Sequence, residues 1–550
     1  MNRDPVFSRR ALWLLVLLGA LVWFANLDYR KLVRPDEGRY AEIPREMVAS
    51  GDWLTPRLND LKYFEKPALQ YWATAAAYEA FGETHWAARL WTALTGFLGI
   101  LFTAFAGMRL WGRQAGAYAG LICASCTLYI GIGHLLTLDM GVTFFLNAGV
   151  LCLALAQRER QPDISRNWML AGWASLGLAI LSKGLIGAVL PGGAFVVYSL
   201  VCGDFAAWKK LQIGKGLALL LLITAPWFIW VSMVNPDFAH FFFIHEHWDR
   251  FFKTEHHRTG VWYYFIPILL AGMLPWTLLM FSALATAWRR EPVEGFQARR
   301  FLLVWCVLVF VFFSISESKL PSYILPIFPA LALLIGERAT RLSPRVLFWS
   351  IAPVALLGAA LAGFSPSAVK FASDEVPVAL YQAYVPWLLV AGLVALAGAG
   401  LAAWWGGQGR TAAAITALGA AGLLANQIGL TGHESLAPAS SSYYLVPQIQ
   451  PYLKPGIPFY SLGMYEQTLP FYIKRTLTLV EFRDEMDFGL TQEPAKGIPD
   501  YIEFSRRWML PDAQGSLAIM NPNSLQYFDQ HHLPYEIIAR DTRRVVVRRP

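Results

Sequence analysis

The chain has 550 residues, of which 56% are hydrophobic and 15% are charged, whereas soluble proteins carry about 25% charged residues. Its apolar residues are grouped in blocks of roughly 20, the length that crosses a bilayer. Composition therefore excludes a soluble globular protein and indicates a polytopic membrane protein. The net charge of +8 comes from basic residues spread over short loops, which argues against nucleic acid as a partner.

About thirteen apolar segments are predicted to span the membrane, because each approaches the ~20 residues that a crossing helix needs. The first is read as a retained span rather than a cleaved signal peptide. Residues 68–81 are also apolar but contain Glu79, so an interfacial helix is expected there. The predicted cores are residues 11–27, 87–108, 115–134, 140–157, 167–181, 184–202, 214–234, 261–283, 301–315, 322–337, 346–364, 385–405 and 411–431.

Two details qualify these spans. Ser182-Lys183-Gly184 either separates two of them or breaks a single long helix. Gly116 and Gly120 form a pair of small residues one helical turn apart, which predicts close helix packing.

The distribution of Lys and Arg over the short loops predicts the orientation of the chain. Basic residues gather in alternate loops, for example at Arg109 and Arg113, and such loops stay on the cytoplasmic side. An odd number of spans then places the C-terminal segment on the opposite side. The long loop at residues 28–86 is expected on that side as well.

Residues 28–86 carry a dense group of charges. Asp36, Arg39, Glu65 and Lys66 lie there, interleaved with aromatic residues such as Tyr63. Charges this dense cannot lie in lipid, so they belong at the membrane surface or in a polar cavity. Acids and bases together suit a site that binds an anionic group and holds a carboxylate beside it. The alternative is a solvated loop whose charges only pair with one another.

Three later motifs place charged residues at span ends, where ionisable groups are functional candidates. Asp139 opens one span, and its alternative role is that of a helix N-cap. Lys183 lies between two apolar runs, where it either binds a lipid phosphate or only extends toward the surface. Lys319 and Tyr323 lie in a Pro-rich turn, and an ordinary turn is the alternative.

Residues 241–258 are rich in histidine and aromatic side chains. His245 and His247 suggest zinc, with one carboxylate supplied from elsewhere in the chain. The spacing does not match the H-E-x-x-H motif, and residues two apart do not share a helix face. An interfacial loop with aromatic anchors is the alternative that the sequence favours.

After Thr431 the composition becomes polar enough for a small soluble domain at residues 432–550. Strand patterns alternate with helix patterns there, which favours an α/β layer. No Gly-rich phosphate-binding motif is present, so no nucleotide is expected. The expected strands are residues 458–463, 476–482 and 516–520, with a hairpin at 535–540 and 544–549, and the expected helices are 466–473, 499–509 and 524–531.

The charged motifs of the membrane region resemble those of bacterial polyprenyl-phosphate-dependent glycosyltransferases of the protein-mannosyltransferase-like superfamily. Within it, the chain resembles the lipid A 4-amino-4-deoxy-L-arabinose transferases in particular. The loop at residues 28–86, called the first outer loop below, is the most specific part of this resemblance. The motifs that carry it are Arg34-Pro-Asp-Glu-Gly-Arg39-Tyr-Ala-Glu42, Ser50-Gly-Asp-Trp53, Tyr63-Phe-Glu-Lys-Pro67, Leu138-Asp139, Ser182-Lys183-Gly184 and Lys319-Leu-Pro-x-Tyr323-x-x-Pro326.

The resemblance implies a C-type glycosyltransferase fold at residues 1–431 in the bacterial inner membrane, with the site and residues 432–550 in the periplasm. It implies an inverting transfer of 4-amino-4-deoxy-L-arabinose from undecaprenyl phosphate to a lipid A phosphate. That reaction would lower the negative charge of lipopolysaccharide and confer resistance to cationic peptides such as polymyxin. A monomer in contact with membrane lipids is expected.

The resemblance also implies roles for single residues. Asp36 and Asp139 are expected to be the acids of the site, and Glu65 with a histidine of the 245–257 loop is expected to hold any divalent metal such as zinc. An ionised phosphate acceptor needs no strong base, so the main need is for cations at the departing lipid phosphate. The expected substrate ligands are Arg39, Tyr63, Lys66, Lys183, Lys319 and Tyr323.

Three other readings remain open from the sequence. The first is a related transferase that moves mannose or arabinose onto a protein or glycan. The second is a transporter, although the charges concentrate on one side and no internal repeat is evident. The third is a lipid-binding assembly protein without turnover.

Overall fold

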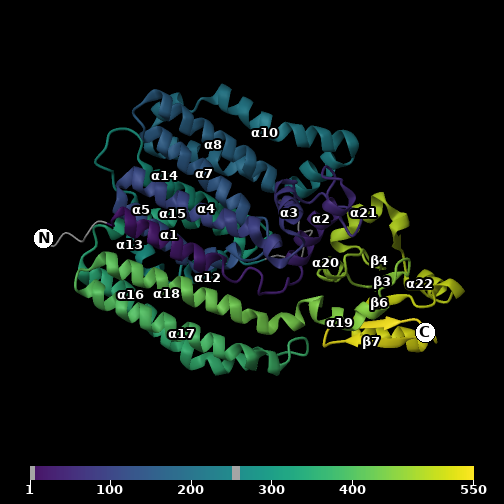
Figure 1. Cartoon of the computed structure of the whole chain (residues 1–550). Helices are drawn as coiled ribbons and strands as arrows, with labels where there is room; N and C mark the ends of the chain where they lie inside the picture. Colours follow the sequence, from purple (N-terminus) through teal and green to yellow (C-terminus); the bar gives the residue numbers. More distant parts are fainter. Residues whose placement is uncertain (1–6, 250–259) are drawn as a thin grey trace.

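The computed structural model describes residues 7–249 and 260–550, with the backbone alone at residues 246–249. Long helices run side by side in one bundle, and a smaller α/β domain covers one end of it (Figure 1). Helix α1 (Arg9–Phe24) starts at the opposite end of the bundle. The polytopic helical fold with a C-terminal α/β domain is therefore confirmed.

The helices of the bundle account for the predicted spans, each as a single helix, a bent pair, or a 3₁₀ turn followed by a helix. Their bounds are α1 (Arg9–Phe24), α4 (His85–Trp111), α5 (Arg113–Ser125), α6 (Thr127–Gly133), α7 (Asp139–Arg158), α8 (Pro162–Lys183), α9 (Ile186–Cys202), α10 (Ile213–Val234), α12 (Phe265–Gly272), α13 (Thr277–Ala287), α14 (Ala298–Ile315), η3 (Pro321–Ile327), α15 (Phe328–Ala339), α16 (Pro344–Phe364), α17 (Val378–Gly407) and α18 (Thr411–Gly432).

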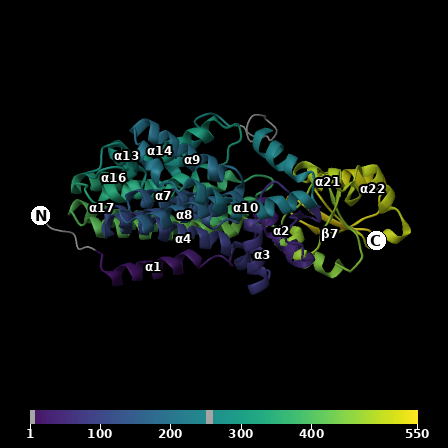
Figure 2. The ribbon, with the colours of Figure 1, turned by 90° about the horizontal axis from the view of Figure 1, so that it is seen from above.

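Within residues 7–249 and 260–550, eight helices are long and apolar enough to cross a membrane, or up to ten if each bent pair is one span. Helices α1, α8 and α9 coincide with three further predicted spans but fall outside that count, so a total of thirteen stays a prediction. Figure 2 shows α1 along one edge of the bundle. Gly184 separates α8 from α9 with φ of 97°, so the residues around Lys183 divide two helices.

The two bent pairs meet at their breaks. The α5–α6 pair bends by 64° and the α12–α13 pair by 109°. The backbone N–H of Thr127, at the first break, donates to the carbonyl of Leu274 at the second, over 3.1 Å. Each break therefore helps to satisfy backbone groups that would otherwise be unpaired in an apolar environment.

The first outer loop is folded rather than extended. Helix α2 (Asp36–Ser50) starts with two acids in its first turn, and their interaction with the helix dipole stabilises it. The helix ends at Gly51, which has φ of 75°. A short hairpin of β1 (Arg57–Leu58) and β2 (Leu61–Lys62) follows. The predicted interfacial helix is α3 (Leu69–Phe81).

The C-terminal domain contains a sheet of six strands in the order β5-β4-β3-β6-β8-β7. The first four strands in that order are parallel, and β8 and β7 form the predicted antiparallel hairpin. The strands are β3 (Phe459–Leu462), β4 (Thr478–Val480), β5 (Gly497–Ile498), β6 (Leu517–Met520), β7 (Glu536–Arg540) and β8 (Val545–Arg548).

Both faces of this sheet are covered, so its central strands are fully buried, as parallel strands usually are. On one face, Tyr460 and Met520 pack with helices α22 (Tyr501–Trp508) and α23 (Leu525–Gln530). On the other face, Phe459 and Leu479 share a core with Leu58 and Tyr63 of the first outer loop. The outer loop therefore serves as one layer of the C-terminal domain.

The prediction for this domain missed some short elements. Strand β5 and helix α21 (Asp487–Gln492) are too short to give a periodic pattern. The helix expected at residues 466–473 is α20 (Leu469–Ile473) and starts later. The remaining short helices are η1 (Phe205–Lys210), η2 (His240–Asp249), η4 (Ser365–Phe371), η5 (His433–Ala439), η6 (Ser442–Leu445), α19 (Val446–Ile449), η7 (Gln450–Tyr452), η8 (Asp484–Met486), η9 (Pro494–Lys496), η10 (Pro511–Ala513) and η11 (Pro522–Ser524).

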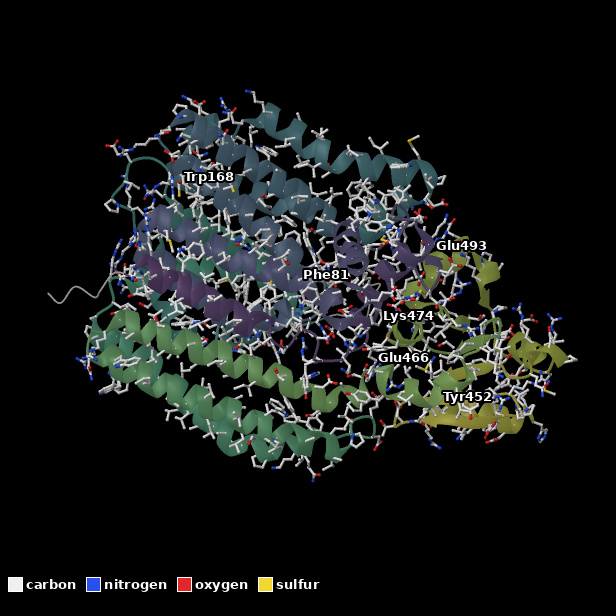
Figure 3. The ribbon with its side chains drawn as sticks, viewed as in Figure 1. Phe81, Trp168, Tyr452, Glu466, Lys474 and Glu493 are labelled. Carbon is white, nitrogen blue, oxygen red and sulfur yellow. The ribbon has the colours of Figure 1, made fainter. Side chains whose placement is uncertain are left out.

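Polar contacts fix the outer loop to the C-terminal domain. The side-chain amide of Asn59 donates to the carbonyl of Leu477 over 2.6 Å and accepts from its N–H over 2.7 Å. Arg57 forms an ion pair with Glu493 at 3.0 Å, and Lys474 forms one with Glu83 at 2.6 Å. Figure 3 places Lys474 and Glu493 where this domain meets the end of the bundle.

Candidate active site

Helix α2 presents the first acid of the site. Asp36 is the first residue of that helix, so Arg39, three positions later, lies on the same face. A carboxylate oxygen of Asp36 lies 3.7 Å from a guanidinium nitrogen of Arg39. The Asp36 side chain is 43% exposed, whereas that of Arg39 is 8% exposed. The carboxylate of Asp36 is therefore accessible to a ligand, whereas its cationic neighbour Arg39 is buried.

Glu37, beside Asp36, has a structural role. Its carboxylate accepts two hydrogen bonds from the guanidinium of Arg89 in α4, at 2.7 and 2.8 Å. It also accepts the backbone N–H groups of Val33 and Leu136. Burial alone would raise the pKa of Glu37, but Arg89 lowers it to about 2. Glu37 thus fixes the start of α2 to the membrane bundle.

The second acid lies at the start of α7. Asp139 is the first residue of that helix and forms a salt bridge with Lys183 from the end of α8. The Lys183 ammonium also lies 4.9 Å from the ring of Tyr323 in η3. Leu138, not Asp139, holds the N-cap position, so the N-cap reading of Asp139 was wrong. Lys183 turns inward to this acid rather than extending toward the surface.

The Glu65-Lys66 pair is close enough to both Arg39 and Asp139 for its charges to act on them. The Lys66 ammonium is 4.0 Å from the Glu65 carboxylate and donates to the Glu65 carbonyl over 2.6 Å. Lys66 is among the charges that act on Asp139, and Glu65 is among those that act on Arg39. The structure therefore brings the predicted residues of the outer loop and of the span ends into one neighbourhood.

Tyr63 lies behind this group. Its side chain is 2% exposed, and among the described residues its hydroxyl has no hydrogen-bond partner. Burial raises the pKa of Tyr63 well above its usual value, although the nearby Arg39 opposes this. A neutral phenol next to Arg39 can donate a hydrogen bond to an anionic ligand.

Lys319 binds the backbone of its own turn. Its ammonium donates to the carbonyls of Ser314 and Ser316 at the end of α14, over 2.9 and 2.8 Å. Burial lowers its pKa. These contacts cap a helix C-terminus, so Lys319 supports the turn that carries Tyr323, and a role in ligand binding stays a prediction.

The predicted metal site consists of Glu65, His245 and His247. Across the part of the chain that the structure describes, no three His, Cys, Asp or Glu side chains come together as metal ligands. His245 stacks on Phe241 with ring centroids 5.1 Å apart. The side chain of His247 lies outside the described residues, so the metal site stays a prediction.

An acid from the C-terminal domain also reaches the site. Glu485 forms an ion pair with Arg39, and its own side chain is 6% exposed. Burial raises the pKa of Glu485, although Arg39 opposes this. No signal in the sequence pointed to Glu485, because it lies in a single 3₁₀ turn, η8, far along the chain from Arg39.

Aromatic side chains pack beside the charged group. Phe64 contacts Phe238, with centroids 5.1 Å apart, and Phe488 of the C-terminal domain at 5.7 Å. Phe488 also packs on Phe241 at 4.2 Å. Through Phe238 and Phe241, the segment at residues 235–260 thus packs against both the outer loop and the C-terminal domain. Residues 250–259 of that segment lie outside the described residues.

Two family models match the chain. The model for dolichyl-phosphate-mannose-protein mannosyltransferase matches residues 9–289. The model for the aminoarabinose transferase C-terminal domain matches residues 445–549. Together they cover helices α1 to α13 with the first outer loop, and the sheet that packs on that loop.

Curated relatives are named undecaprenyl phosphate-alpha-4-amino-4-deoxy-L-arabinose arabinosyl transferases. That of Erwinia tasmaniensis is 37% identical over 345 residues, which is 61% of this chain and 60% of the relative. That of Aeromonas salmonicida is 37% identical over 335 residues, 60% of each chain. The chain thus matches about three fifths of the length of these relatives.

Solved structures extend the match. ArnT from Cupriavidus metallidurans, bound to undecaprenyl phosphate, is 39% identical with a TM-score of 0.93, and the match covers 98% of both chains. The archaeal oligosaccharyltransferase AglB from Archaeoglobus fulgidus is 11% identical with a TM-score of 0.51, which is a likeness of fold alone. The expected C-type glycosyltransferase fold is confirmed, and the chain belongs to the aminoarabinose transferases of the protein-mannosyltransferase superfamily.

Proposed function

We propose that the chain is an inverting glycosyltransferase that moves 4-amino-4-deoxy-L-arabinose from undecaprenyl phosphate to a phosphate of lipid A. The observation that carries this proposal is the meeting of two acids, Asp36 and Asp139, with the cations Arg39, Lys66 and Lys183 at one end of the bundle. The names of the curated relatives and the lipid bound to ArnT support the sugar and its carrier.

In this reaction an acceptor phosphate oxygen attacks the anomeric carbon of the sugar. The bond from that carbon to undecaprenyl phosphate breaks, and its electron pair leaves with the lipid phosphate. Negative charge therefore grows on the leaving phosphate, where Lys66 and Lys183 would stabilise it. The acceptor is already ionised at neutral pH, so no strong base is needed.

Asp36 would act on the other side of the sugar. Its partly exposed carboxylate can hold the cationic amine of the sugar or stabilise positive charge at the anomeric carbon. Tyr63 and Tyr323 would donate hydrogen bonds to phosphate oxygens. Lys319 would contribute indirectly by fixing the turn that carries Tyr323.

The place of the reaction is also part of the proposal. The site shares its end of the bundle with the C-terminal domain (Figure 1), and the bias of basic residues toward the other loops supports a periplasmic position. The expected membrane is the bacterial inner membrane, where a lipid donor and a lipid acceptor both reach the site from the bilayer. A monomer is sufficient, because one chain supplies every residue named above.

A divalent metal such as zinc would be held by Glu65 with His245 or His247. Bound there, it would neutralise phosphate charge next to Lys66. Transfer by purified protein should then fall on treatment with a chelator and return with zinc. Full activity after chelation, with no metal found in the protein, would rule this part out.

Substitution of Asp36 tests the catalytic proposal. Asp36→Asn keeps the shape of the side chain but removes its charge, so transfer should fall at least about 100-fold while undecaprenyl phosphate still binds. The measurement is transfer by purified protein in detergent with the lipid-linked sugar and lipid A. Full activity of the variant would refute the role of Asp36.

Mass spectrometry of lipid A tests the substrates. Cells that produce the protein should add an aminopentose to lipid A, and cells with Asp36→Asn should not. Addition of mannose to protein, or an unchanged lipid A with sugar flux across the membrane, would instead favour one of the rival readings.

A further inference from the structure

We propose that Glu485, from the C-terminal domain, is a positioning residue of the transfer site, which holds Arg39 so that Asp36 stays directed toward the sugar. This inference rests on the proposed function. It adds the C-terminal domain to the machinery of transfer, since the only acids assigned so far belong to the outer loop and the membrane bundle.

The first support is that the guanidinium of Arg39 contacts two acids. One terminal nitrogen pairs with Glu485, and the other lies 3.7 Å from Asp36. Arg39 and Glu485 are 8% and 6% exposed, whereas Asp36 is 43% exposed. Glu485 is therefore the deep anchor of the guanidinium, and Asp36 is the looser partner that faces outward.

The second support is that Glu485 is itself held in place. The side-chain amide of Gln467 donates to the Glu485 carboxylate over 3.0 Å. The backbone of Gln467 lies directly on α2 at Gly38, where an added Cβ would come within 2.6 Å of the Gln467 carbonyl. Because only glycine permits this approach, Gly38 brings Arg39, the next residue, within reach of Glu485.

The third support is backbone strain around Glu485. Glu481 and Asp484 have φ of 48° and 34°, in the left-handed region that residues other than glycine rarely occupy. Such strain persists where the surrounding structure enforces it, and it concentrates at functional sites. Phe488, one turn beyond Glu485, packs on Phe64 and so fixes the far end of the segment.

The consequence for the site follows from the burial of Arg39. A buried guanidinium needs an acid beside it. Without Glu485, Asp36 at 3.7 Å would be the nearest described ion-pair partner of Arg39, so Arg39 would shift toward it and compete with the cationic sugar amine. With Glu485 present, the C-terminal domain supplies the acid that the buried guanidinium needs.

The experiment compares Glu485→Gln and Glu485→Asp with the wild-type protein. Glu485→Gln keeps the hydrogen bond from Gln467 but removes the charge, so kcat should fall roughly 10- to 100-fold through misplacement of Arg39 and Asp36. The KM for the lipid-linked sugar should change about twofold or less, because Lys66 and Lys183 still bind its phosphate. Glu485→Asp should restore part of the lost kcat.

Glu503→Gln is the matched control, since Glu503 is an acid of the same domain whose ion pairs among the described residues are with Arg506 and Arg507 on its own helix. It should leave kcat and KM unchanged. A merely structural role of Glu485 would lower the folded fraction without changing kcat per folded protein, and that result would overturn the proposal. Unchanged kcat in Glu485→Gln would also overturn it.

Two further readouts keep the outcomes distinct. Binding of undecaprenyl phosphate measures the fraction of each variant that is folded. If Glu485→Gln does not fold, the test depends on Glu485→Asp alone. An unchanged kcat of Glu485→Asp then contradicts the proposal, and a reduced kcat supports it. If the wild-type protein itself transfers no sugar, the proposed function fails. If it does and the Glu485 variants match it, only the present inference fails.

Discussion

Adjacent carboxylates at the start of α2 have opposite environments. Asp36 is partly exposed at the rim of the site, whereas Glu37 is 2% exposed and bound to Arg89. The helical geometry explains the difference, because successive residues point about 100° apart and so face different neighbours. Both acids stand in the same sequence motif, and only the structure separates the one available to a substrate from the one that holds the helix.

Substitution of Glu37 should therefore affect stability. Glu37→Gln leaves Arg89 buried without its charge partner, so at neutral pH the free energy of unfolding should fall by about 3 kcal/mol. The carboxylate has its pKa lowered from 4.5 to about 2, so its stabilisation is present above about pH 4.5. That stabilisation is lost as the pH falls toward about 2.

The measurement is thermal unfolding in detergent between pH 7 and pH 3. The gap between wild-type protein and Glu37→Gln should shrink with acid. Glu79→Gln, at an exposed acid on α3, should show no gap at any pH. A gap of constant size would contradict the assignment of the stabilisation to the Glu37 charge.

Among the helices, close contact of α4 with α5 depends on small residues. Gly116 and Gly120 of α5 lie against Ala104 and Met108 of α4, where an added Cβ on Gly116 would collide with the α4 backbone. The predicted role of this pair in helix packing is confirmed. In lipid, such backbone contact replaces the hydrophobic effect as the driving force for helix association.

Alanine at Gly116 should consequently destabilise the bundle. Alanine in place of glycine normally stabilises a helix by about 0.5 to 1 kcal/mol, but Gly116→Ala forces α4 and α5 apart and should cost about 1 to 3 kcal/mol. Gly214→Ala in α10, where an added Cβ meets nothing within 4 Å, is the control. Equal unfolding temperatures for the two variants would contradict this account.

The elements also show what the sequence can predict. The spans were predictable because a helix that crosses lipid must be apolar over its whole length, and each predicted core coincides with a helix, a bent pair or a 3₁₀–α pair. The bends were not predictable from that rule, because the carbonyl of Leu274 that receives the Thr127 N–H comes from a distant segment. Short elements such as β5 were missed for lack of a periodic pattern.

At the scale of the whole molecule, the outer loop and the C-terminal domain form one unit. Leu58 and Tyr63 share a core with Phe459 and Leu479. The residues of the loop that gather near Asp36 were predictable, because they are close in sequence. Glu485 was not, because contacts between distant segments depend on the fold, which a single sequence does not display.

Reversal of charges at the contact between the outer loop and the C-terminal domain should show that the two stabilise each other. Arg57→Glu places an acid next to Glu493, so it should lower the free energy of unfolding by about 1 kcal/mol and speed proteolysis of the C-terminal domain. Arg57→Glu combined with Glu493→Arg should recover part of both losses. Arg506→Glu, in an exposed pair within the domain, should not alter proteolysis, and no recovery in the double variant would count against the contact.

Three consecutive residues of α2 contact both the membrane bundle and the C-terminal domain. Glu37 binds Arg89 of the bundle, Gly38 touches Gln467, and Arg39 pairs with Glu485. The outer loop and the C-terminal domain are consequently constrained to evolve together. A chimera that joins the membrane helices of one relative to the C-terminal domain of another has to exchange the first outer loop with that domain, and Arg89 must still match the loop that it receives.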